Sequence, residues 1–225
     1  MDAPPIVYSV VIPVYKNEES LPQVLERLEN MQLRLNGPLE AVFVVDGSPD
    51  GSLALLRSLL PRADINTQLL AHSRNFGSFP AIKTGFAHAR GEFVAAMAAD
   101  LQEPSELIEE FFGQLATGEY DVAVGTRESR EDPFVSRTLS NAYWSSYRGL
   151  VQPSMPRGGV DIFATTRAVA EKLVSLDESN SSLVGLLFWL GYRRVEIPYS
   201  RLEREHGKSA WSMRKKVKYL MDSIF

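Results

Sequence analysis

Residues 8–35, YSVVIPVYKNEESLPQVLERLENMQLRL, begin with a strand pattern and continue with a helix pattern. Residues 8–14 are rich in β-branched and aromatic side chains, which favour a strand. Residues 20–35 carry apolar side chains at helical spacing, namely Leu21, Val24, Leu25 and Leu28. This spacing predicts an amphipathic helix. A strand followed directly by a helix is the beginning of a βαβ unit, so a parallel sheet is expected.

The same alternation continues through the first half of the chain. Further strands are predicted at residues 41–45, 67–71, 92–98 and 121–125, and further helices at residues 52–60, 79–89 and 105–115. In the second half we predict strands at 158–163 and 193–198 and helices at 167–175 and 182–191. The pattern predicts an α/β fold with a Rossmann-like, mainly parallel twisted sheet and helices on both faces.

Composition limits the function classes. The chain has 225 residues, a formal net charge of −4 and no cysteine. The length suits a single domain with an ample core. Nucleic-acid-binding proteins are usually basic, so the acidic balance argues against one. The lack of cysteine excludes thiol nucleophiles, thiolate zinc sites and disulfides, and three scattered histidines make a histidine-rich metal site a poor expectation.

No segment is long and apolar enough to span a bilayer, which needs about 20 mostly apolar residues. The last part of the chain is instead basic, with Arg214, Lys215, Lys216 and Lys218 ahead of the final YLMDSIF. Such a segment fits either a solvated helix face or a contact with an anionic membrane surface. Composition alone leaves both interpretations open.

Polar clusters follow four successive strands, where parallel sheets bind ligands. They are PVYKNE at 13–18, DGSPDG at 46–51, SRNFG at 73–77 and DLQEP at 100–104. Taken alone, each also fits an ordinary turn or helix start. Asp46 could accept hydrogen bonds from a base or ribose, and the guanidinium of Arg74 suits phosphate. Asp100 with the amide of Gln102 is a plausible oxygen site for Mg²⁺ or Mn²⁺.

Rival nucleotide and hydrolase motifs are missing from the sequence. There is no G-x-G-x-x-G after the first strand, no G-x-x-x-x-G-K-[ST] and no G-x-S-x-G. Their absence argues against a nicotinamide dehydrogenase, a P-loop ATPase and an α/β-hydrolase. A sugar nucleotidyltransferase is also disfavoured, because the loop after the first strand holds no glycine.

The set of motifs resembles the family 2 glycosyltransferases of the GT-A fold, closest to the polyprenyl-phosphate glycosyltransferases such as dolichol-phosphate mannose synthase. The matching stretches are VIPVYKNE at 11–18, VDGSPDGS at 45–52, SRNFG at 73–77, AHARG at 87–91, ADLQEP at 99–104, GGVD at 158–161, WLGY at 189–192, IPYSR at 197–201 and REHGKS at 204–209. The resemblance covers nearly the whole chain. It implies one GT-A catalytic domain, with a nucleotide-sugar half at 1–126, an acceptor half at 127–210 and a basic juxtamembrane segment at 211–225.

The resemblance also implies an activity: inverting transfer of a sugar from a nucleoside-diphosphate sugar to an undecaprenyl or dolichyl phosphate. The implied nucleoside pocket comprises Pro13, Tyr15, Glu18 and Asp46, with Arg74 and Asp100 also on the donor side. Asp100 and Gln102 would hold the Mg²⁺ or Mn²⁺ that bridges the diphosphate. Members of the family commonly continue into transmembrane helices, so we expect a longer native chain on the cytoplasmic face of a membrane.

One departure concerns the metal motif. The family usually has Asp-x-Asp-Leu-Gln-Asp-Pro, whereas this chain has Ala98-Ala-Asp-Leu-Gln-Glu-Pro104. On a strand, positions 98 and 100 share a face, so Ala98 removes a carboxylate beside Asp100. Three interpretations stay open: a metal held by Asp100, Gln102 and the diphosphate alone, a weakened or inactive enzyme, or an engineered change.

The acceptor half supplies the remaining candidates. Arg201, Arg204 and Ser209 are expected phosphate contacts, with Arg127 a weaker one; a solvated basic surface is the alternative. Asp161 is the best candidate for a catalytic base or acceptor-orienting group, with a structural role about as plausible. A sugar hydroxyl acceptor would need such a base. A catalytically silent nucleotide-binding module is a further alternative, and assembly into a homo-oligomer is left open.

Overall fold

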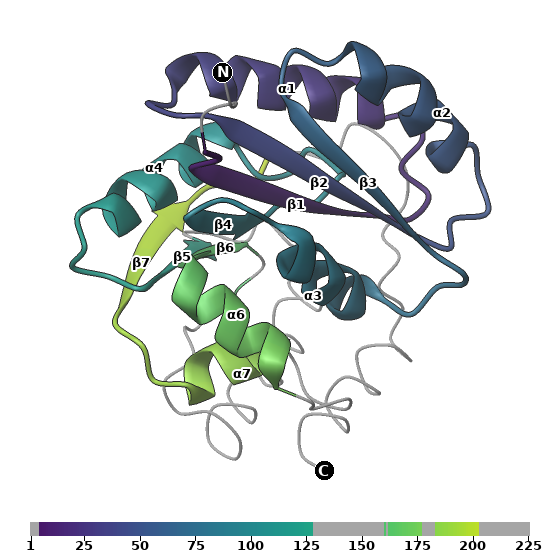
Figure 1. Cartoon of the computed structure of the whole chain (residues 1–225). Helices are drawn as coiled ribbons and strands as arrows, with labels where there is room; N and C mark the ends of the chain where they lie inside the picture. Colours follow the sequence, from purple (N-terminus) through teal and green to yellow (C-terminus); the bar gives the residue numbers. More distant parts are fainter. Residues whose placement is uncertain (1–4, 128–159, 161, 177–182, 203–225) are drawn as a thin grey trace, which may run out of the picture.

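The computed structural model describes residues 5–127, 160, 162–176 and 183–202. Within these residues seven strands form one sheet, in the order β3-β2-β1-β4-β6-β5-β7 (Figure 1). The strands are β1 (Tyr8–Val14), β2 (Leu39–Asp46), β3 (Asn66–His72), β4 (Phe93–Ala96), β5 (Val122–Arg127), β6 (Phe163–Thr166) and β7 (Arg194–Tyr199).

The sheet is mainly parallel, as predicted. β1 pairs in parallel with both β2 and β4, and β3 and β7 extend the sheet in parallel with β2 and β5. β6 is antiparallel to its neighbours β4 and β5. Because a single strand is reversed, the carboxyl ends of the other six all lie at one edge of the sheet.

Helices cover both faces of the sheet (Figure 1). They are α1 (Leu21–Arg34), α2 (Ser52–Leu59), the short 3₁₀ turn η1 (Leu60–Arg62), α3 (Ser78–His88), α4 (Ser105–Ala116), α6 (Arg167–Ser175) and α7 (Leu183–Trp189). One core joins α1, α2 and α4 to one face of the sheet, and a second core joins α3, α6 and α7 to the other. The prediction of a sheet sandwiched between helix layers is therefore confirmed.

Strand β1 is buried on both faces of the sheet. Alternate side chains of β1 enter different cores: Val10 and Ile12 face α1, whereas Val11 faces α3. Such burial on both faces is characteristic of a parallel strand between helix layers. In α1 the apolar stripe predicted from the sequence is buried, and it continues to Met31.

A buried carboxylate joins three segments near the amino ends of β1 and β2. Glu40 is fully buried and accepts hydrogen bonds from Ser9 Oγ at 2.7 Å, from Arg90 Nε at 2.8 Å and from Gln68 Nε2 at 3.1 Å. Burial alone would raise the pKa of Glu40, but the hydrogen bonds from Arg90, Ser9 and Gln68 outweigh it and the pKa is lowered. The AHARG stretch therefore has a structural role on the edge opposite the strand ends that the sequence singled out.

Several predicted boundaries differ from the structure by one or two residues. β4 ends at Ala96, two residues before the expected end at 98. The strand expected at 158–163 overlaps β6 at Phe163, and residues 158, 159 and 161 lie outside the described residues. Among the described helices, none has the length and apolar character needed to cross a membrane. The basic segment 211–225 lies outside the described residues.

Candidate active site at the carboxyl ends of the strands

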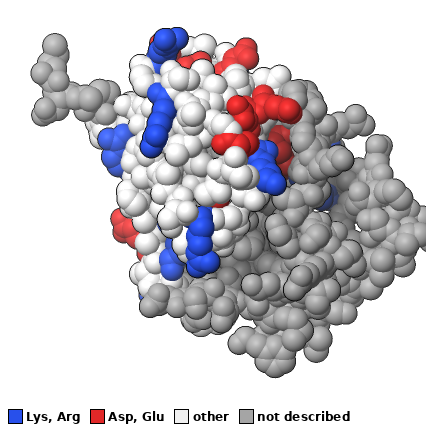
Figure 2. Space-filling view, turned by 90° about the vertical axis from the view of Figure 1, so that its right-hand side faces the viewer, with Lys and Arg blue, Asp and Glu red and all other residues white. Residues whose placement is uncertain are grey.

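The strand order brings the four predicted polar clusters to one edge of the sheet. β1, β2, β3 and β4 are neighbours and run in the same direction, so the residues that follow them share this edge. Figure 2 looks onto the side of the molecule toward which β1, β2 and β3 point, where acidic and basic side chains lie next to one another. This is the edge at which parallel sheets bind ligands.

The loops after β1 and β2 are joined by several hydrogen bonds. The amide of Lys16 donates to Ser48 Oγ at 2.8 Å, and the amide of Gly51 donates to Glu18 Oε2 at 2.7 Å. The amide of Glu18 donates to Asp50 Oδ2 at 3.3 Å. Lys16 has φ +59°, a left-handed conformation that the hydrogen bonds between the two loops hold in place. Two predicted nucleoside-pocket residues, Tyr15 and Glu18, therefore sit on a braced loop.

Asp50 is a member of this network that the sequence did not single out. Its Oδ1 accepts hydrogen bonds from Ser48 Oγ at 2.6 Å and from the amide of Ser52 at 3.2 Å. Partial burial would raise the pKa of Asp50, but hydrogen bonds from Ser48, Ser52 and Glu18 outweigh it, and the pKa lies below its usual value. The only sequence signal for this role is the position of Asp50 just before a helix.

Asp46 lies at the end of β2 and is 2% exposed. Its carboxylate accepts hydrogen bonds from the amides of Phe76 at 2.9 Å and Gly77 at 2.7 Å. Oδ1 of Asp46 also lies 2.9 Å from His72 Nδ1, and His72 Nε2 lies 3.0 Å from Thr84 Oγ1. In this structure the Asp46 side chain thus holds the loop after β3, an interaction that the sequence did not reveal. Its predicted contact with a nucleoside stays a prediction.

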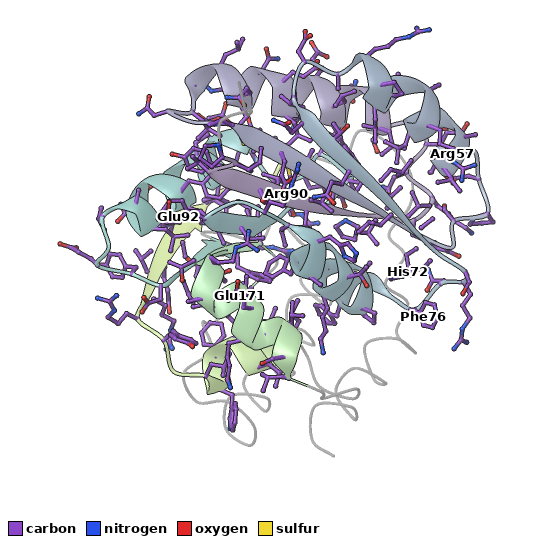
Figure 3. The ribbon with its side chains drawn as sticks, viewed as in Figure 1. Arg57, His72, Phe76, Arg90, Glu92 and Glu171 are labelled. Carbon is purple, nitrogen blue, oxygen red and sulfur yellow. The ribbon has the colours of Figure 1, made fainter. Side chains whose placement is uncertain are left out.

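The loop at 73–77 presents an arginine and an aromatic ring to solvent. The guanidinium carbon of Arg74 lies 4.6 Å from the centroid of the Phe76 ring, and Phe76 is 47% exposed. The rings of His72 and Phe76 meet edge to face at 5.4 Å, and Figure 3 shows both residues together, well away from Arg90 and Glu92. Arg74 is therefore available at this edge, as the prediction of a phosphate contact requires.

The loop after β4 is held by side chains at the start of α1 and within it. Ser20 Oγ donates to the carbonyl of Ala99 at 2.6 Å, and Arg27 Nη1 donates to the carbonyl of Leu101 at 3.2 Å. Although β4 ends at Ala96, exposure still alternates beyond it: Ala98 and Asp100 are partly exposed, and Ala99 between them is buried. Positions 98 and 100 are thus both accessible from solvent, although they lie beyond the end of the strand.

Asp100 and Gln102 lie beside Arg201, which follows β7. Arg201 Nη2 donates to Gln102 Oε1 at 2.5 Å and lies 3.9 Å from Asp100 Oδ2. The side-chain oxygen atoms of Asp100 and Gln102 therefore already lie near one positive group. Carboxylate and amide oxygen atoms are also suitable ligands for Mg²⁺ or Mn²⁺. Among the described residues there is no group of three or more His, Cys, Asp or Glu side chains that could hold a metal ion. Any divalent ion here would need further oxygen atoms from a ligand or water.

The remaining predicted residues are placed as follows. Pro13 is half-buried in β1 opposite Val44, and Arg127 ends β5 opposite Tyr199 of β7. Arg127 therefore lies at the same sheet edge as Arg201. Asp161, Arg204 and Ser209 lie outside the described residues.

Comparison with known proteins identifies the family of the chain. The family model described as "Glycosyl transferase family 2" matches residues 9–174. The undecaprenyl-phosphate 4-deoxy-4-formamido-L-arabinose transferase of Proteus mirabilis is 33% identical over 96% of this chain and 66% of its own length. The uncharacterized glycosyltransferase YkcC of Bacillus subtilis is 32% identical over 97% of this chain and 68% of its own length. The chain thus spans about two thirds of these relatives.

Solved structures share the fold. A mannosyltransferase from Pyrobaculum calidifontis, in complex with GDP-Man and Mn²⁺, has a TM-score of 0.58 and 21% identity, covering 90% of this chain and 59% of its own. Glucosyl-3-phosphoglycerate synthase from Mycobacterium tuberculosis, with Mn²⁺ and UDP-glucose, has a TM-score of 0.59 and 16% identity, covering 97% of this chain and 80% of its own. These neighbours have the GT-A-like architecture expected from the sequence. The chain belongs to glycosyltransferase family 2.

Proposed function

We propose that this chain transfers a sugar, with inversion, from a nucleoside-diphosphate sugar to a polyprenyl phosphate. One observation carries the proposal: Asp100 and Gln102 lie next to Arg201 at the edge of the sheet where the parallel strands end, although Arg201 is almost a hundred residues later in the chain. Two oxygen ligands and a guanidinium are the groups needed to bind a diphosphate with its metal. The relatives named as undecaprenyl-phosphate transferases support the choice of acceptor.

On the donor side, the braced loops after β1 and β2 form the proposed nucleoside pocket. It comprises Pro13, Tyr15, Glu18 and Asp46. Because hydrogen bonds between the loops already fix their backbones, little ordering would be needed when the nucleoside binds. Arg74, exposed at the same edge, would contact a phosphate through its planar guanidinium.

Asp100 and Gln102 are the proposed holders of Mg²⁺ or Mn²⁺. Since position 98 supplies no carboxylate, the diphosphate and water would complete the set of oxygen ligands. A bound divalent ion would help to neutralise the charge that develops on the departing diphosphate. The Mn²⁺ in two structural neighbours supports the choice of ion.

On the acceptor side, the nucleophile would be the lipid phosphate itself. The second pKa of a phosphate monoester is about 6, so the group is largely dianionic at neutral pH and needs no base. Arg127, Arg201, Arg204 and Ser209 would orient this phosphate, and Asp161 would orient the acceptor. The basic segment 211–225 would contact anionic headgroups on the cytoplasmic face of the membrane.

Two other functions follow from particular residues. If Asp161 acts as a general base, the acceptor would be a sugar hydroxyl. Asp161→Asn should then abolish transfer to a hydroxyl but weaken transfer to a phosphate much less. If Ala98 leaves the metal site too weak, the chain would be a nucleotide-binding module that binds donor without turnover.

The deciding experiment combines a binding panel with a transfer assay. Thermal unfolding would be followed with UDP-, GDP-, CMP- and dTDP-sugars, each with and without Mn²⁺, since a specific ligand raises Tm by mass action. The stabilising donor is then incubated with undecaprenyl phosphate or with a sugar acceptor, with Asp100→Asn as the control. Sugar transfer to the lipid that Asp100→Asn abolishes supports the proposal. Stabilisation without transfer to either acceptor would instead identify a binding module, and no stabilisation by any donor would overturn the proposal.

A further inference from the structure

The guanidinium of Arg201 lies against the two side chains proposed to hold the metal. Its Nη2 is 2.5 Å from Gln102 Oε1 and 3.9 Å from Asp100 Oδ2. The Arg201 side chain is 30% exposed and that of Asp100 only 15%, so their attraction is less screened than that of a fully exposed pair. A positive group is therefore present beside both oxygen ligands before any ion arrives.

The residue after Arg201, Leu202, is hydrogen-bonded to Gln102. The amide of Leu202 donates to the carbonyl of Gln102 at 2.9 Å, and Gln102 Nε2 donates back to the carbonyl of Leu202 at 3.4 Å. Gln102 and Leu202 therefore join the loop after β4 to the segment after β7. These bonds fix the backbone next to Arg201 against the loop after β4, which keeps the guanidinium within reach of Gln102.

A divalent ion and this guanidinium compete for the same oxygen atoms. Two like charges about 4 Å apart repel each other strongly when partly shielded from water, and an ion of charge +2 is repelled more strongly. Gln102 Oε1 would also have to exchange its hydrogen bond for a metal bond. Arg201 must therefore move away before Asp100 and Gln102 can both coordinate an ion.

We infer that Arg201 is a resident counter-charge of the metal site, which exchanges places with the divalent ion only when a diphosphate arrives. The diphosphate offers the displaced guanidinium a bidentate anionic partner, which compensates for the contact with Gln102 that it loses. Arg201 thereby makes metal binding depend on the donor, in addition to any contact with the acceptor. This inference rests on the proposed function.

The test measures Mn²⁺ binding to the 225-residue chain without donor, by the electron paramagnetic resonance signal of free Mn²⁺. Arg201→Gln and Arg201→Ala should tighten binding of Mn²⁺ alone by about tenfold or more, because the competing charge is gone. Arg201→Lys keeps the charge and should stay near the unsubstituted chain. With excess UDP or GDP, whichever binds, the gain from Arg201→Gln should shrink or reverse, because Arg201 then contacts the diphosphate.

The matched control is Arg193→Gln. It removes the same charge just before β7, where Arg193 is paired with Asp121 and its side chain is 62% exposed. Mn²⁺ binding should stay unchanged. Equal or weaker binding by folded Arg201→Gln and Arg201→Ala would overturn the exchange while leaving the proposed function standing. Adding Asp100→Asn to Arg201→Gln separates the two ideas: if Mn²⁺ binding persists there, the metal site itself is wrong, and with it both the inference and the proposed donor site.

Discussion

The amide of Gly77 donates a hydrogen bond of 2.7 Å to Oδ2 of Asp46, thirty-one residues earlier in the chain. A second amide, that of Phe76, donates to Oδ1 of the same carboxylate. The end of β2 therefore fixes the loop after β3, and with it the exposed Arg74. Asp46, which the sequence analysis assigned to the nucleoside pocket, thus also holds the loop at 73–77 in place.

Replacing Asp46 with alanine should loosen this loop. The amides of Phe76 and Gly77 would lose their acceptor, at a cost of about 1–3 kcal/mol for each group that stays buried. We expect lower stability in urea unfolding and faster hydrogen exchange in a peptide covering residues 73–79. Asp46→Asn should have a smaller effect because it keeps one acceptor oxygen. The exposed Asp64→Ala is the control, and exchange that is equally slow in Asp46→Ala would contradict the bracing role.

Gly47 should tolerate no side chain. Its φ is +57°, and a Cβ there would lie 2.2 Å from the backbone carbon of Arg74. Gly118 has a similar φ of +75° but open space around it, so Gly118→Ala carries only the conformational cost of about 1–2 kcal/mol. Gly47→Ala should be clearly more destabilising, by about 3 kcal/mol or more, since backbone must also move. Equal loss of stability in the two variants, measured by urea unfolding, would show that the loops at 46–51 and 73–77 are not packed this closely.

Glu40→Gln should lower stability at neutral pH by about 1–3 kcal/mol, because a buried charged acceptor of several hydrogen bonds is neutralised. The pKa of Glu40 is lowered from its ordinary value of 4.5, so its stabilising contribution is complete above pH 4.5. The contribution is lost as the pH falls below 4.5, through the lowered pKa. The stability difference between the two proteins should therefore be constant from pH 6 to 8 and shrink in acid.

Urea unfolding at several pH values measures this difference directly. The exposed pair of Asp121 and Arg193 provides the comparison, because there the hydrogen bonds from Arg193 lower the pKa of Asp121 at the surface. Asp121→Asn should cost at most about 1 kcal/mol. A Glu40→Gln effect that is just as large at pH 3 as at pH 7 would show that the ionised form of Glu40 is not what stabilises the fold.

Ala98→Asp should tighten Mn²⁺ binding in the presence of nucleotide. Ala98 and Asp100 are both partly exposed and only two positions apart, so a new carboxylate at position 98 would be accessible to an ion bound at Asp100. An added charged oxygen ligand should improve affinity by about tenfold or more. Calorimetric titration measures the change, with Ala98→Asn as the uncharged control of equal size. Unchanged affinity would argue against a metal site at this strand end.

Much of the fold could be read from the sequence because the signals are local. The helix spacing of Leu21, Leu25 and Leu28 and the β-rich run at 8–14 each depend on neighbours within a few residues. Boundaries were less certain: β4 ends at Ala96 because its pairing with β1 and β6 ends there, and periodicity does not carry that information. The reversed direction of β6 was also not predicted, since it depends on which strands are neighbours.

The order of residues shows without any coordinates that polar clusters follow successive strands and that Asp100 and Gln102 could bind a divalent ion. The hydrogen-bonding partners of these residues became known from the folded chain: Gln102 with Arg201 and Asp46 with Gly77, as well as the buried Glu40 with Arg90. The difference lies in the separation of the interacting residues along the chain. Strand and helix periodicity arises within single elements, whereas these hydrogen bonds join residues 31 to 99 positions apart, and the order in which seven strands pair sets which of them can meet.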